Sequence, residues 1–562
     1  MNKRHIIRTL TSVLAFIASL IHTFAHTDDQ PSLWSCNAPL RETRAVWLTT
    51  IGGLDWPRIK ATDASSREAQ KRELIAILDS YKRANINTVI FQTRVRAALV
   101  YPSAIEPWEL SLTGTPGRDP GYDPLAFCIE ECHKRGMELH AWIVCIPIGT
   151  QQRQKGYGAS SIIKRHSQLV KTAKGGEMFM IPGRPETADY IASICREITE
   201  RYDIDGISLD YIRYPEPVYN FSDTNLYNRS CGMSLADWRR DNITRIVRRV
   251  HDVVKPIKPW VKLSSSPIGK YSDTGRYSAG GWNCYHAVWQ DPKLWLSQNY
   301  QDMLFPMMYF TGDNFYPFLY DWQETCAPHP VIPGLGIYFL DPREGRWALN
   351  DVRAEMHTAR NSNIGGMAFY RGEFLTRNVK GLYDAVCEEF FPYPALTARM
   401  TWMGDTIAPN PPSFIDYKDG TLSWGKSHRL YTSNPSGTHH DDYILYNVYG
   451  SNNYPVDVTR PEHLLMTNLR STFSTLDFRA IRLRYYAVTA IDRMGNESQP
   501  IQQDPPTVTA PRTIDIKKLI NRGTETKTGT KTKTEMKTKT KSKIKTVTKK
   551  GTEDRKKTEK EK

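Results

Sequence analysis

The chain has 562 residues, 40% of them hydrophobic and 11% aromatic, so it is long enough to bury a large core in two or more domains. Its net charge of +15 is concentrated at the ends: residues 513–562 carry 18 Lys or Arg against 7 Asp or Glu, and residues 1–25 add Lys3, Arg4 and Arg8. The body between them is nearly neutral, which argues against nucleic acid as a partner, because a nucleic-acid-binding fold carries its basic patch on the folded surface.

The first 25 residues have the three parts of a secretory signal peptide: a basic start, an apolar run from Leu10 to Leu20, and small residues up to Ala25. We expect cleavage after Ala25 and export of the mature protein to the periplasm, the cell envelope or the medium. The nine cysteines allow one or two disulfides in an oxidising compartment. Cys128 and Cys132, one helical turn apart, are interpreted as small core residues rather than a metal pair.

Between residues 41 and 391, strand-like apolar runs alternate with helical ones. The predicted strands are 42–51, 87–94, 138–146, 206–210, 261–266, 302–310, 331–339 and 365–370. The clearest predicted helices are 66–85, 124–135, 185–202 and 235–254. Asp123 caps the second of these and Pro124 begins it. Eight β units over about 350 residues predict a (β/α)₈ TIM barrel. A doubly wound open sheet is the alternative, but no glycine-rich phosphate turn follows the first strand.

The pattern of apolar and turn-forming residues changes after residue 391. A proline-rich linker is predicted at 392–408, and short alternating runs at 420–424, 443–449 and 484–491 predict a small all-β sandwich over 409–508. Trp424 and the Tyr-rich strand before the turn at 495–498 resemble a fibronectin type III module. Residues 513–562 are Lys- and Thr-rich and predicted to be disordered. This tail is interpreted as solvated, with weak contact to an anionic wall polymer or membrane surface as the alternative.

Asp210 ends the most informative of the predicted strands. Ile207 and Leu209 point to one face and Gly206, Ser208 and Asp210 to the other, as side chains in a strand alternate. The small and polar face suits the lumen of a parallel barrel, and the chemistry of such barrels is at the C-terminal mouth. Asp210 is therefore a candidate catalytic carboxylate, and a loop-fixing Asp is the alternative.

Several strand ends carry residues suited to sugars. Flat aromatic rings occur at or near six of them: Trp47, Trp142, Tyr211, Tyr309, Tyr338 and Tyr370. Arg94 and Arg213 end the second and fourth strands. A guanidinium near Asp210 would favour the ionised carboxylate, which suits a nucleophile or a charge stabiliser.

Glycoside cleavage needs a second carboxyl group. The candidates are Asp341 after the seventh strand, Glu373 after the eighth, Asp313 after the sixth, and Glu216 shortly after Asp210. No zinc-protease motif, phosphate-binding loop, serine-hydrolase elbow or zinc spacing occurs, so neither a metal nor a cofactor is expected.

Many segments in one order resemble the glycosyl-hydrolase-like 10 family of secreted bacterial proteins. They include RAVWLTTIGGLDWP (44–57), FQTRVRAALVYPSAIEPW (91–108), PGYDPLAFCIEECHKRGMELHAW (120–142) and YDIDGISLDYIRYP (202–215). DWRRDN (237–242), FPMMYF (305–310) and GLGIYFLDP (334–342) continue the likeness over about 350 residues. The resemblance implies a (β/α)₈ fold and a glycosidase that cleaves peptidoglycan glycan strands. It also maps the family's strand-end Asp to Asp210 and its FQxR arginine to Arg94.

The expected function is thus a secreted glycoside hydrolase that acts on peptidoglycan strands or another polysaccharide. The alternative is a non-catalytic carbohydrate-binding or envelope-organising protein on the same scaffold. The chain has Ala98 where relatives often carry an acid, and Tyr211 where some carry a second Asp. A third hypothesis gives the main role to the basic tail as a tether.

Overall fold

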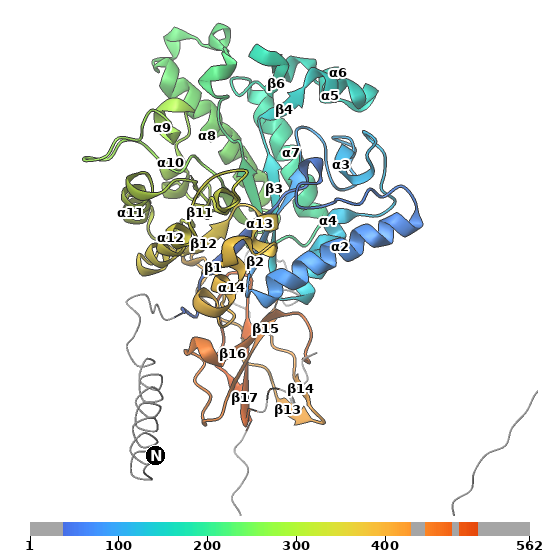
Figure 1. Ribbon diagram of the computed structural model, residues 1–562, viewed down its shortest axis with the longest axis vertical. Helices are drawn as coiled ribbons and strands as arrows, with labels where there is room; N and C mark the ends of the chain where they lie inside the picture. Colours follow the sequence, from blue (N-terminus) through green and yellow to red (C-terminus); the bar gives the residue numbers. More distant parts are fainter. Residues whose placement is uncertain (1–37, 429–443, 475–480, 482, 504–562) are drawn as a thin grey trace, which may run out of the picture. The chain divides into compact units, whose positions relative to one another are not determined.

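A computed structural model of the chain describes residues 38–428, 444–474, 481 and 483–503 (Figure 1). All of these residues belong to one compact unit. The predicted signal peptide at 1–25 and the predicted tail at 513–562 lie outside the described residues. Among the helices that are described, none combines the length and the apolar character needed to cross a membrane.

A nine-stranded parallel sheet organises the larger part of the chain, in the order β10–β11–β12–β1–β2–β3–β7–β8–β9. Its strands are β1 (Thr43–Leu48), β2 (Thr88–Arg94), β3 (Glu138–Val144), β7 (Gly206–Asp210), β8 (Lys262–Ser265), β9 (Met303–Leu304), β10 (Met307–Met308), β11 (Gly334–Leu335) and β12 (Gly366–Phe369). The two ends of this order, β9 and β10, are separated in the chain only by residues 305–306. The prediction of a parallel α/β sheet is confirmed.

Helices follow most of these strands. The long ones are α2 (Ala64–Arg83), α4 (Pro124–Lys134), α7 (Pro185–Arg201), α8 (Leu235–Val254), α11 (Tyr316–Cys326) and α12 (Leu349–Asn361). The short ones are α3 (Leu110–Thr113), α5 (Gln151–Gly156), α6 (Ile162–Arg165), α9 (Cys284–Ala287), α10 (Pro292–Ser297), α13 (Gly372–Thr376) and α14 (Leu382–Ala385). As predicted, α4 begins at Pro124 and is capped by Asp123, whose carboxylate accepts from the backbone N–H of Ala126.

The two faces of the sheet bury different side chains. Ile207 and Leu209 belong to the main apolar cluster, which also takes in the buried faces of the helices. A second apolar cluster on the other face contains Ala45, Trp47, Ile90, Trp142, Val144, Met303, Phe305, Ile332 and Ala368. The alternation predicted for β7 therefore holds, and Asp210 lies on the face of the second cluster, where Trp142 bonds to it.

Two predicted strands are shorter than expected. Residues 302–310 form two short strands, β9 and β10, with Phe305 and Pro306 between them. Residues 331–339 pair at β11 and through a single bridge from Val331 to Leu304, and Ile337–Leu340 form a 3₁₀ helix, η9. Tyr338 therefore stands on a helical turn rather than on a strand.

The segment between β3 and α7 forms a separate small antiparallel sheet in the order β4–β6–β5. Its strands are β4 (Pro147–Thr150), β5 (Val170–Thr172) and β6 (Glu177–Met180). Thr150 pairs with Glu177 in its register. These three strands are not among the eight β units that the sequence predicted.

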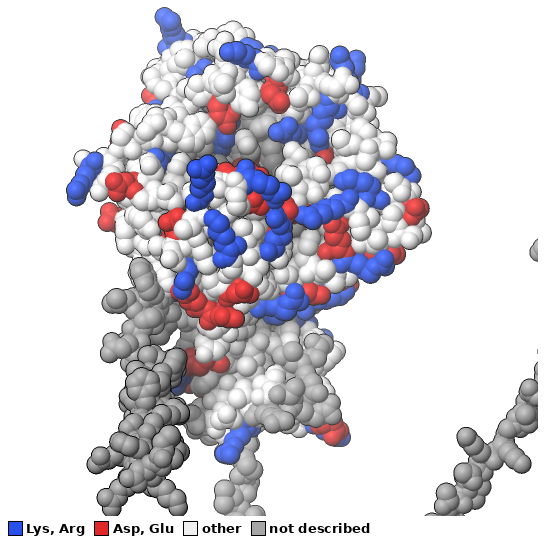
Figure 2. All heavy atoms as spheres, in the orientation of Figure 1, with Lys and Arg blue, Asp and Glu red and all other residues white. Residues whose placement is uncertain are grey.

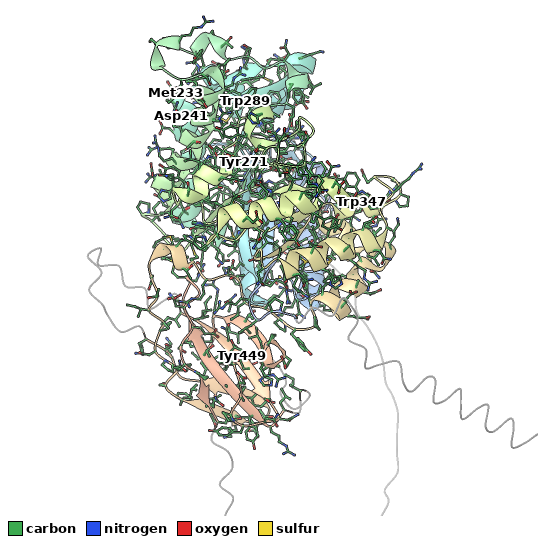
Figure 3. The ribbon with its side chains drawn as sticks, turned by 90° about the vertical axis from the view of Figure 1, so that its left-hand side faces the viewer. Met233, Asp241, Tyr271, Trp289, Trp347 and Tyr449 are labelled. Carbon is green, nitrogen blue, oxygen red and sulfur yellow. The ribbon has the colours of Figure 1, made fainter. Side chains whose placement is uncertain are left out.

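The C-terminal part is all-β. A hairpin of β13 (Ile415–Lys418) and β14 (Thr421–Trp424) accompanies a sheet ordered β16–β15–β17–β18, with β15 (Leu445–Ser451), β16 (Leu464–Leu469), β17 (Tyr485–Ile491) and β18 (Ile501–Gln502). Trp424 packs on Tyr446 with ring centroids 5.7 Å apart, so the two sheets share a core. Tyr449, labelled in Figure 3, is buried in β15 and donates to Glu497 (2.7 Å). We call residues 409–503 the C-terminal module.

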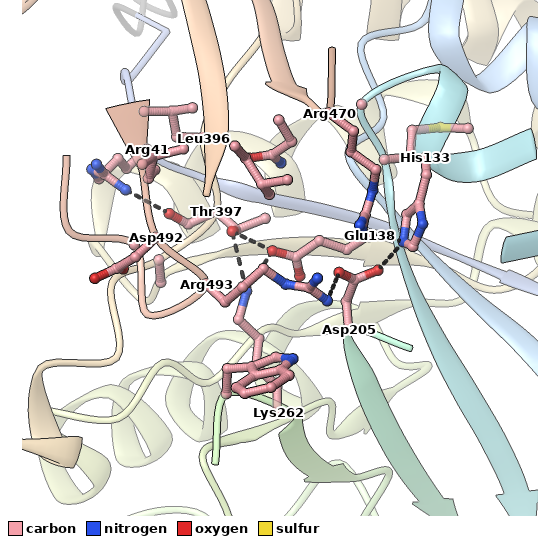
Figure 4. A pocket seen from close by; sticks show the side chains of 18 residues that line it. Arg41, His133, Glu138, Asp205, Lys262, Leu396, Thr397, Arg470, Asp492 and Arg493 are labelled. Carbon is pink, nitrogen blue, oxygen red and sulfur yellow. Dashed lines mark hydrogen bonds and ion pairs between the residues drawn. The ribbon is translucent and has the colours of Figure 1, made fainter. Parts of the chain in front are cut away.

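The C-terminal module contacts the part of the chain that contains the nine-stranded sheet. The contact lies at the N-terminal ends of the parallel strands of that sheet (Figure 4). Arg493 pairs with Asp205, just before β7, at 2.7 Å and with Asp203 at 3.1 Å. His133 lies 2.8 Å from the other oxygen of Asp205. Burial by itself raises the pKa of Asp205, but the charges of His133 and Arg493 outweigh it and hold that pKa well below its usual range. The enclosed space among these side chains is about 30 Å³, the size of a water molecule.

The seven cysteines whose side chains the structure describes are free, and Cys128 and Cys132 are fully buried. Their interpretation as core residues is confirmed. No disulfide joins any two of these seven cysteines, so the predicted disulfides are not found among them.

Candidate active site

A cavity of about 420 Å³ opens at the C-terminal ends of the parallel strands. The strand ends supply Trp47, Gln92, Trp142, Val144, Asp210, Ser266, Met307, Tyr309 and Tyr370 to its wall. The connecting loops and the inserted sheet add Thr49, Ile51, Leu54, Val95, Arg96, Pro147, Glu177, Phe179, Tyr211, Glu216 and Tyr219. A concave site with aromatic walls and a few polar groups is typical of a small-molecule or sugar site.

Asp210 lies in the wall of this cavity with only 5% of its surface exposed. One carboxylate oxygen accepts from the indole N–H of Trp142 (2.9 Å), and the other from the backbone N–H of Tyr211 (2.7 Å). Burial raises the pKa of Asp210, and this outweighs the opposing effects of Arg213 and the two donors. As expected, the guanidinium of Arg213 favours the ionised carboxylate, but burial has the larger effect, so the net change in the pKa of Asp210 is upward.

Arg94 does not line the cavity. Its side chain is completely buried and pairs with Glu106 (2.6 Å between Nη2 and Oε1). It also donates to the carbonyl oxygens of Val144 and Cys145, the latter at 2.9 Å. Arg94 thus ties the end of β2 to the end of β3, and it can influence the cavity only by positioning.

Tyr211 lines the cavity, whereas Arg213 does not belong to its wall and contacts Tyr211. The guanidinium of Arg213 stacks over the Tyr211 ring, 4.4 Å from its centroid, and donates to Glu216 (2.7 Å). Tyr211 has a left-handed backbone (φ 48°) and is 38% exposed. A non-glycine residue in this region is strained, and such residues cluster at functional sites.

The predicted aromatic residues divide into two groups. Trp47, Trp142, Tyr211, Tyr309 and Tyr370 line the cavity. Tyr309 stacks on Tyr370 with centroids 5.2 Å apart and an interplanar angle of 24°. Tyr338 meets both of these rings edge-on at 5.8 Å, so it supports the wall from behind.

Of the four further carboxylates considered in the sequence, one lines the cavity with Asp210 and three do not. Glu216 lines the cavity wall. Asp341 is held by Arg343 (2.8 Å) and Arg377 (3.2 Å), and hydrogen bonds from Arg343 hold its pKa well below the usual range. Glu373 pairs with Arg58 and Arg371, both at 3.0 Å. Asp341 and Glu373 do not belong to the cavity wall, and Asp313 is an exposed residue outside it.

Glu177 is a cavity carboxylate that the sequence reasoning did not consider. It begins β6 of the inserted sheet, and only the pairing of β4 with β6 brings it to the mouth. The one available signal was the short apolar run that follows it, at Met178–Met180.

The described residues contain no group of three or more His, Cys, Asp or Glu side chains placed to hold a metal ion. The cavity wall supplies the carboxyl groups of Asp210, Glu216 and Glu177 together with several aromatic rings. One buried acid and further carboxylates around a cavity of sugar size can support acid–base cleavage of a glycosidic bond.

The chain is similar to a known family and to several known proteins. Residues 42–335 match the family described as Glycosyl hydrolase-like 10. Glycosyl hydrolase YngK of Bacillus subtilis (strain 168) is 30% identical over 482 residues, covering 82% of this chain and 92% of the relative. Glycosyl hydrolase DigH of Escherichia coli (strain K12) is 31% identical over 375 residues, covering 59% of this chain and 84% of the relative. Among solved structures, alpha-L-fucosidase isoenzyme 2 from Paenibacillus thiaminolyticus matches with a TM-score of 0.41 and 14% identity, over 62% of this chain and 50% of that one.

Proposed function

Since the chain belongs to the Glycosyl hydrolase-like 10 family, we propose that it is a glycoside hydrolase in which Asp210 is the general acid. The observation that carries the proposal is the position of Asp210: a buried carboxyl in the cavity wall whose pKa is raised by burial. A raised pKa is what a group needs to protonate the leaving oxygen near neutral pH.

Glu216 is the proposed partner of Asp210. Its carboxylate pairs with Arg213 at 2.7 Å, which supplies a positive charge to an ionised base or nucleophile. The charge of Glu216 is also among the smaller effects that raise the pKa of Asp210. Glu177 is the competing partner, because it lines the same cavity from the inserted sheet.

The proposal includes a closed (β/α)₈ barrel, and the order of the strands in the sheet supports it. The terminal strands β9 and β10 belong to one stretch, residues 303–308, so the pairings run around a ring of eight stretches. Leu304 also bridges to Val331, and Ile268 bridges to Met307. This is the connectivity of a (β/α)₈ barrel with its cavity at the C-terminal mouth.

Peptidoglycan glycan strands are the proposed substrate, with another polysaccharide as the alternative. Export through the segment 1–25, a fibronectin type III fold for the C-terminal module, and weak contact of residues 513–562 with an anionic envelope polymer belong to the same proposal. The neighbouring relatives carry the name glycosyl hydrolase, which specifies no substrate.

Mass spectrometry of the products tests the proposal. The mature protein, Asp210→Asn, Glu216→Gln and Glu177→Gln are incubated with purified glycan strands and a panel of neutral and acidic oligosaccharides. We expect fragments from wild type and none from Asp210→Asn, with turnover lowered at least about 100-fold. A second silent variant, either Glu216→Gln or Glu177→Gln, identifies the partner carboxylate. Equal fragments from wild type and Asp210→Asn would remove Asp210 from the mechanism.

One observation favours a non-catalytic binding protein instead. Both oxygens of Asp210 already accept hydrogen bonds, from Trp142 and from the backbone of Tyr211, which also suits a loop-fixing Asp. In that case no oligosaccharide is cut by any of the four proteins, while glycan affinity is retained.

A further inference from the structure

The segment between β3 and α7 carries a local surplus of positive charge. Residues 147–180 contain a single acid, Glu177, and six basic residues: Arg153, Lys155, Lys164, Arg165, Lys171 and Lys174. The near neutrality of the chain between its two basic ends hides this surplus. Figure 2 shows Lys and Arg side chains over the region where Figure 1 places α5 and α6. We call residues 147–180 the basic insertion.

Most of these positive charges have no carboxylate partner. Arg153 pairs with Glu109. The other five basic side chains are exposed and form no ion pair with a described residue. Arg165 donates to backbone carbonyl oxygens of residues 104 and 105, and Lys171 to that of Ser222, so their charges stay uncompensated. Uncompensated charges of one sign on one segment attract a partner of the opposite sign.

The basic insertion forms one side of the Asp210 cavity. Glu177 and Phe179 of β6 belong to the cavity wall. Lys171 is the register partner of Phe179 across β5 and β6, so the two side chains lie on the same face of the small sheet. The Nζ atom of Lys171 is 5.9 Å from the ring centroid of Phe221, and that ring packs on Phe179 at 6.1 Å. Lys174 begins the 3₁₀ turn η4 (Lys174–Gly176), directly before Glu177. Both lysines therefore lie near the rim of the cavity.

Arg96 extends the positive charge into the cavity itself. It lines the wall, and its guanidinium has no hydrogen bond or ion pair with a described residue. The backbone is left-handed at Arg96 (φ 50°) and at Ala97 (φ 63°), which is strained for residues other than glycine and typical of functional sites. Gln154 of α5 holds this turn by donating its side-chain amide to the carbonyl oxygen of Arg96 (3.0 Å). The basic insertion thus positions an unpaired guanidinium in the cavity wall.

The acids of the cavity wall do not balance these cations. Burial raises the pKa of Asp210, which favours its protonated form. Glu216 already pairs with Arg213 at 2.7 Å. Glu177 is the one wall carboxylate whose charge neither burial nor an ion pair with a described residue offsets. The rim therefore favours a ligand that brings negative charge.

We infer that Arg96, Lys171 and Lys174 bind carboxylate groups of an acidic polysaccharide where its chain runs out of the Asp210 cavity. The inference rests on the proposed function in taking that cavity as the place where the glycan is cut. Carboxylates accept charge-assisted hydrogen bonds from Arg and Lys, and the aromatic walls of the cavity suit the sugar rings next to them.

A lipid surface fits the basic insertion less well. Proteins that bind the membrane interface bury exposed apolar side chains in it, beside their basic residues. None of the large apolar side chains exposed on the described surface belongs to residues 147–180. The occupant that we assign is therefore a polysaccharide.

Calorimetric titration with two probes tests the inference: hexagalacturonate and its fully methyl-esterified form, which has the same sugar chain without the charges. The titrations use the mature chain with Asp210→Asn, so that no probe is cut. We expect the acidic probe to bind at least about tenfold more tightly than the ester, and less tightly as salt rises. Arg96→Gln should lower the affinity for the acidic probe about two- to fivefold, and Lys171→Gln combined with Lys174→Gln at least about fivefold.

A matched double variant separates the rim from general charge. Lys418→Gln combined with Lys426→Gln also removes two exposed positive charges, but from the C-terminal module, and should leave the affinity unchanged. If it lowers the affinity as much as the Lys171 and Lys174 pair does, the attraction has no site and the inference fails. Equal affinity for the acid and its ester would also overturn it.

Two other partners are outcomes of the same test. A single-stranded DNA hexanucleotide that binds as tightly as hexagalacturonate would show attraction to any polyanion. Phosphatidylglycerol vesicles that bind through Lys171 and Lys174, with no binding of hexagalacturonate, would make the basic insertion a lipid contact. Because every titration uses Asp210→Asn, a failure here leaves the proposed hydrolase standing, and a wild type that cuts no glycan does not alter the binding result.

Discussion

Burial raises the pKa of Asp210, and the charge of Arg213, the backbone N–H of Tyr211 and the indole N–H of Trp142 lower it. The hydrogen bond from Trp142 thus lowers the pKa of a carboxyl that burial raises. Replacing Trp142 by Phe removes the donor and keeps an aromatic wall, so the pKa of Asp210 should rise further. A ¹³C NMR titration of the Asp210 carboxyl measures this directly, without any substrate.

Trp347→Phe is the matched control, because Trp347 packs on Phe339 outside the cavity. This variant should leave the Asp210 titration unchanged. A Trp142→Phe titration that shifts to lower pH would contradict the assigned role of the indole.

Arg94 and Glu106 form a buried pair, with 0% and 1% of their side chains exposed. Arg94→Met leaves Glu106 buried with Tyr190 as its one donor among the described residues (3.0 Å), so we expect the free energy of unfolding to fall by about 3–5 kcal/mol. Arg94→Met combined with Glu106→Leu should recover much of this loss, since no charge is then left unpaired. Urea unfolding of the two single variants and the double variant measures the coupling. Strictly additive losses would contradict a direct pair.

Single residues differ in how far sequence could place them. Asp210 was predictable because strand alternation fixes both its face and its end of the strand. Arg94 has the same position in its own strand, but its partner Glu106 lies twelve positions on in an irregular loop that no periodicity describes. Glu177 depends on β4–β6 pairing in an insertion, which is a tertiary contact.

Among the secondary-structure elements, α12 carries an unusual buried acid. Glu355 is fully buried, its two oxygens accept no hydrogen bond from a described residue, and burial followed by the charge of Asp351 raises its pKa well above the usual range. A raised folded-state pKa gives stability that is complete below the unfolded pKa of about 4.3 and is lost as pH rises toward the folded pKa. Glu355→Gln should therefore raise the free energy of unfolding by about 1–3 kcal/mol at pH 7.5, and by less at pH 4.

Thermal and urea unfolding between pH 4 and pH 8 check this expectation. Glu324→Gln, an exposed substitution on the neighbouring α11, should run parallel to wild type over the whole range. If the curve of Glu355→Gln also runs parallel to wild type, Glu355 does not titrate differently in the folded state.

Element boundaries followed the sequence where a clear local signal existed. The helix predicted at 235–254 has those bounds, because its apolar stripe is regular and Ser234 caps it. Residues 337–339 were predicted as strand because the run is apolar, and a short apolar run does not distinguish a strand from a buried turn. Tertiary packing, with Tyr338 against Tyr309 and Tyr370, selects the 3₁₀ turn.

At the scale of the whole molecule, the contact between the C-terminal module and the strand N-termini should depend on pH. Burial raises the pKa values of Asp203 and Asp205, but Arg493 and His133 outweigh it, so both pKa values are lowered. A lowered pKa gives stability that is present above the unfolded pKa of about 3.9 and is lost as pH falls. Arg493→Gln should lower the free energy of unfolding by about 3–5 kcal/mol at pH 7 and by clearly less at pH 3.

Arg460→Gln is the control for this prediction, because its pair with Glu462 is on the surface of the module and the arginine is 57% exposed. Its effect should be below about 1 kcal/mol at both pH values. Equal losses for Arg493→Gln at pH 3 and pH 7 would assign the effect to packing rather than to charge.

The attachment of the C-terminal module to the strand N-termini bears on how the protein can be immobilised. Leu445, at the start of β15, lines the hollow at that junction, whereas Ser451 ends the same strand, so the exposed Asn452 follows at the remote end of the module. The cavity opens at the opposite ends of the parallel strands. A bead coupled through a cysteine introduced at Asn452 would therefore leave the Asp210 cavity facing the solution, accessible even to insoluble polymer particles.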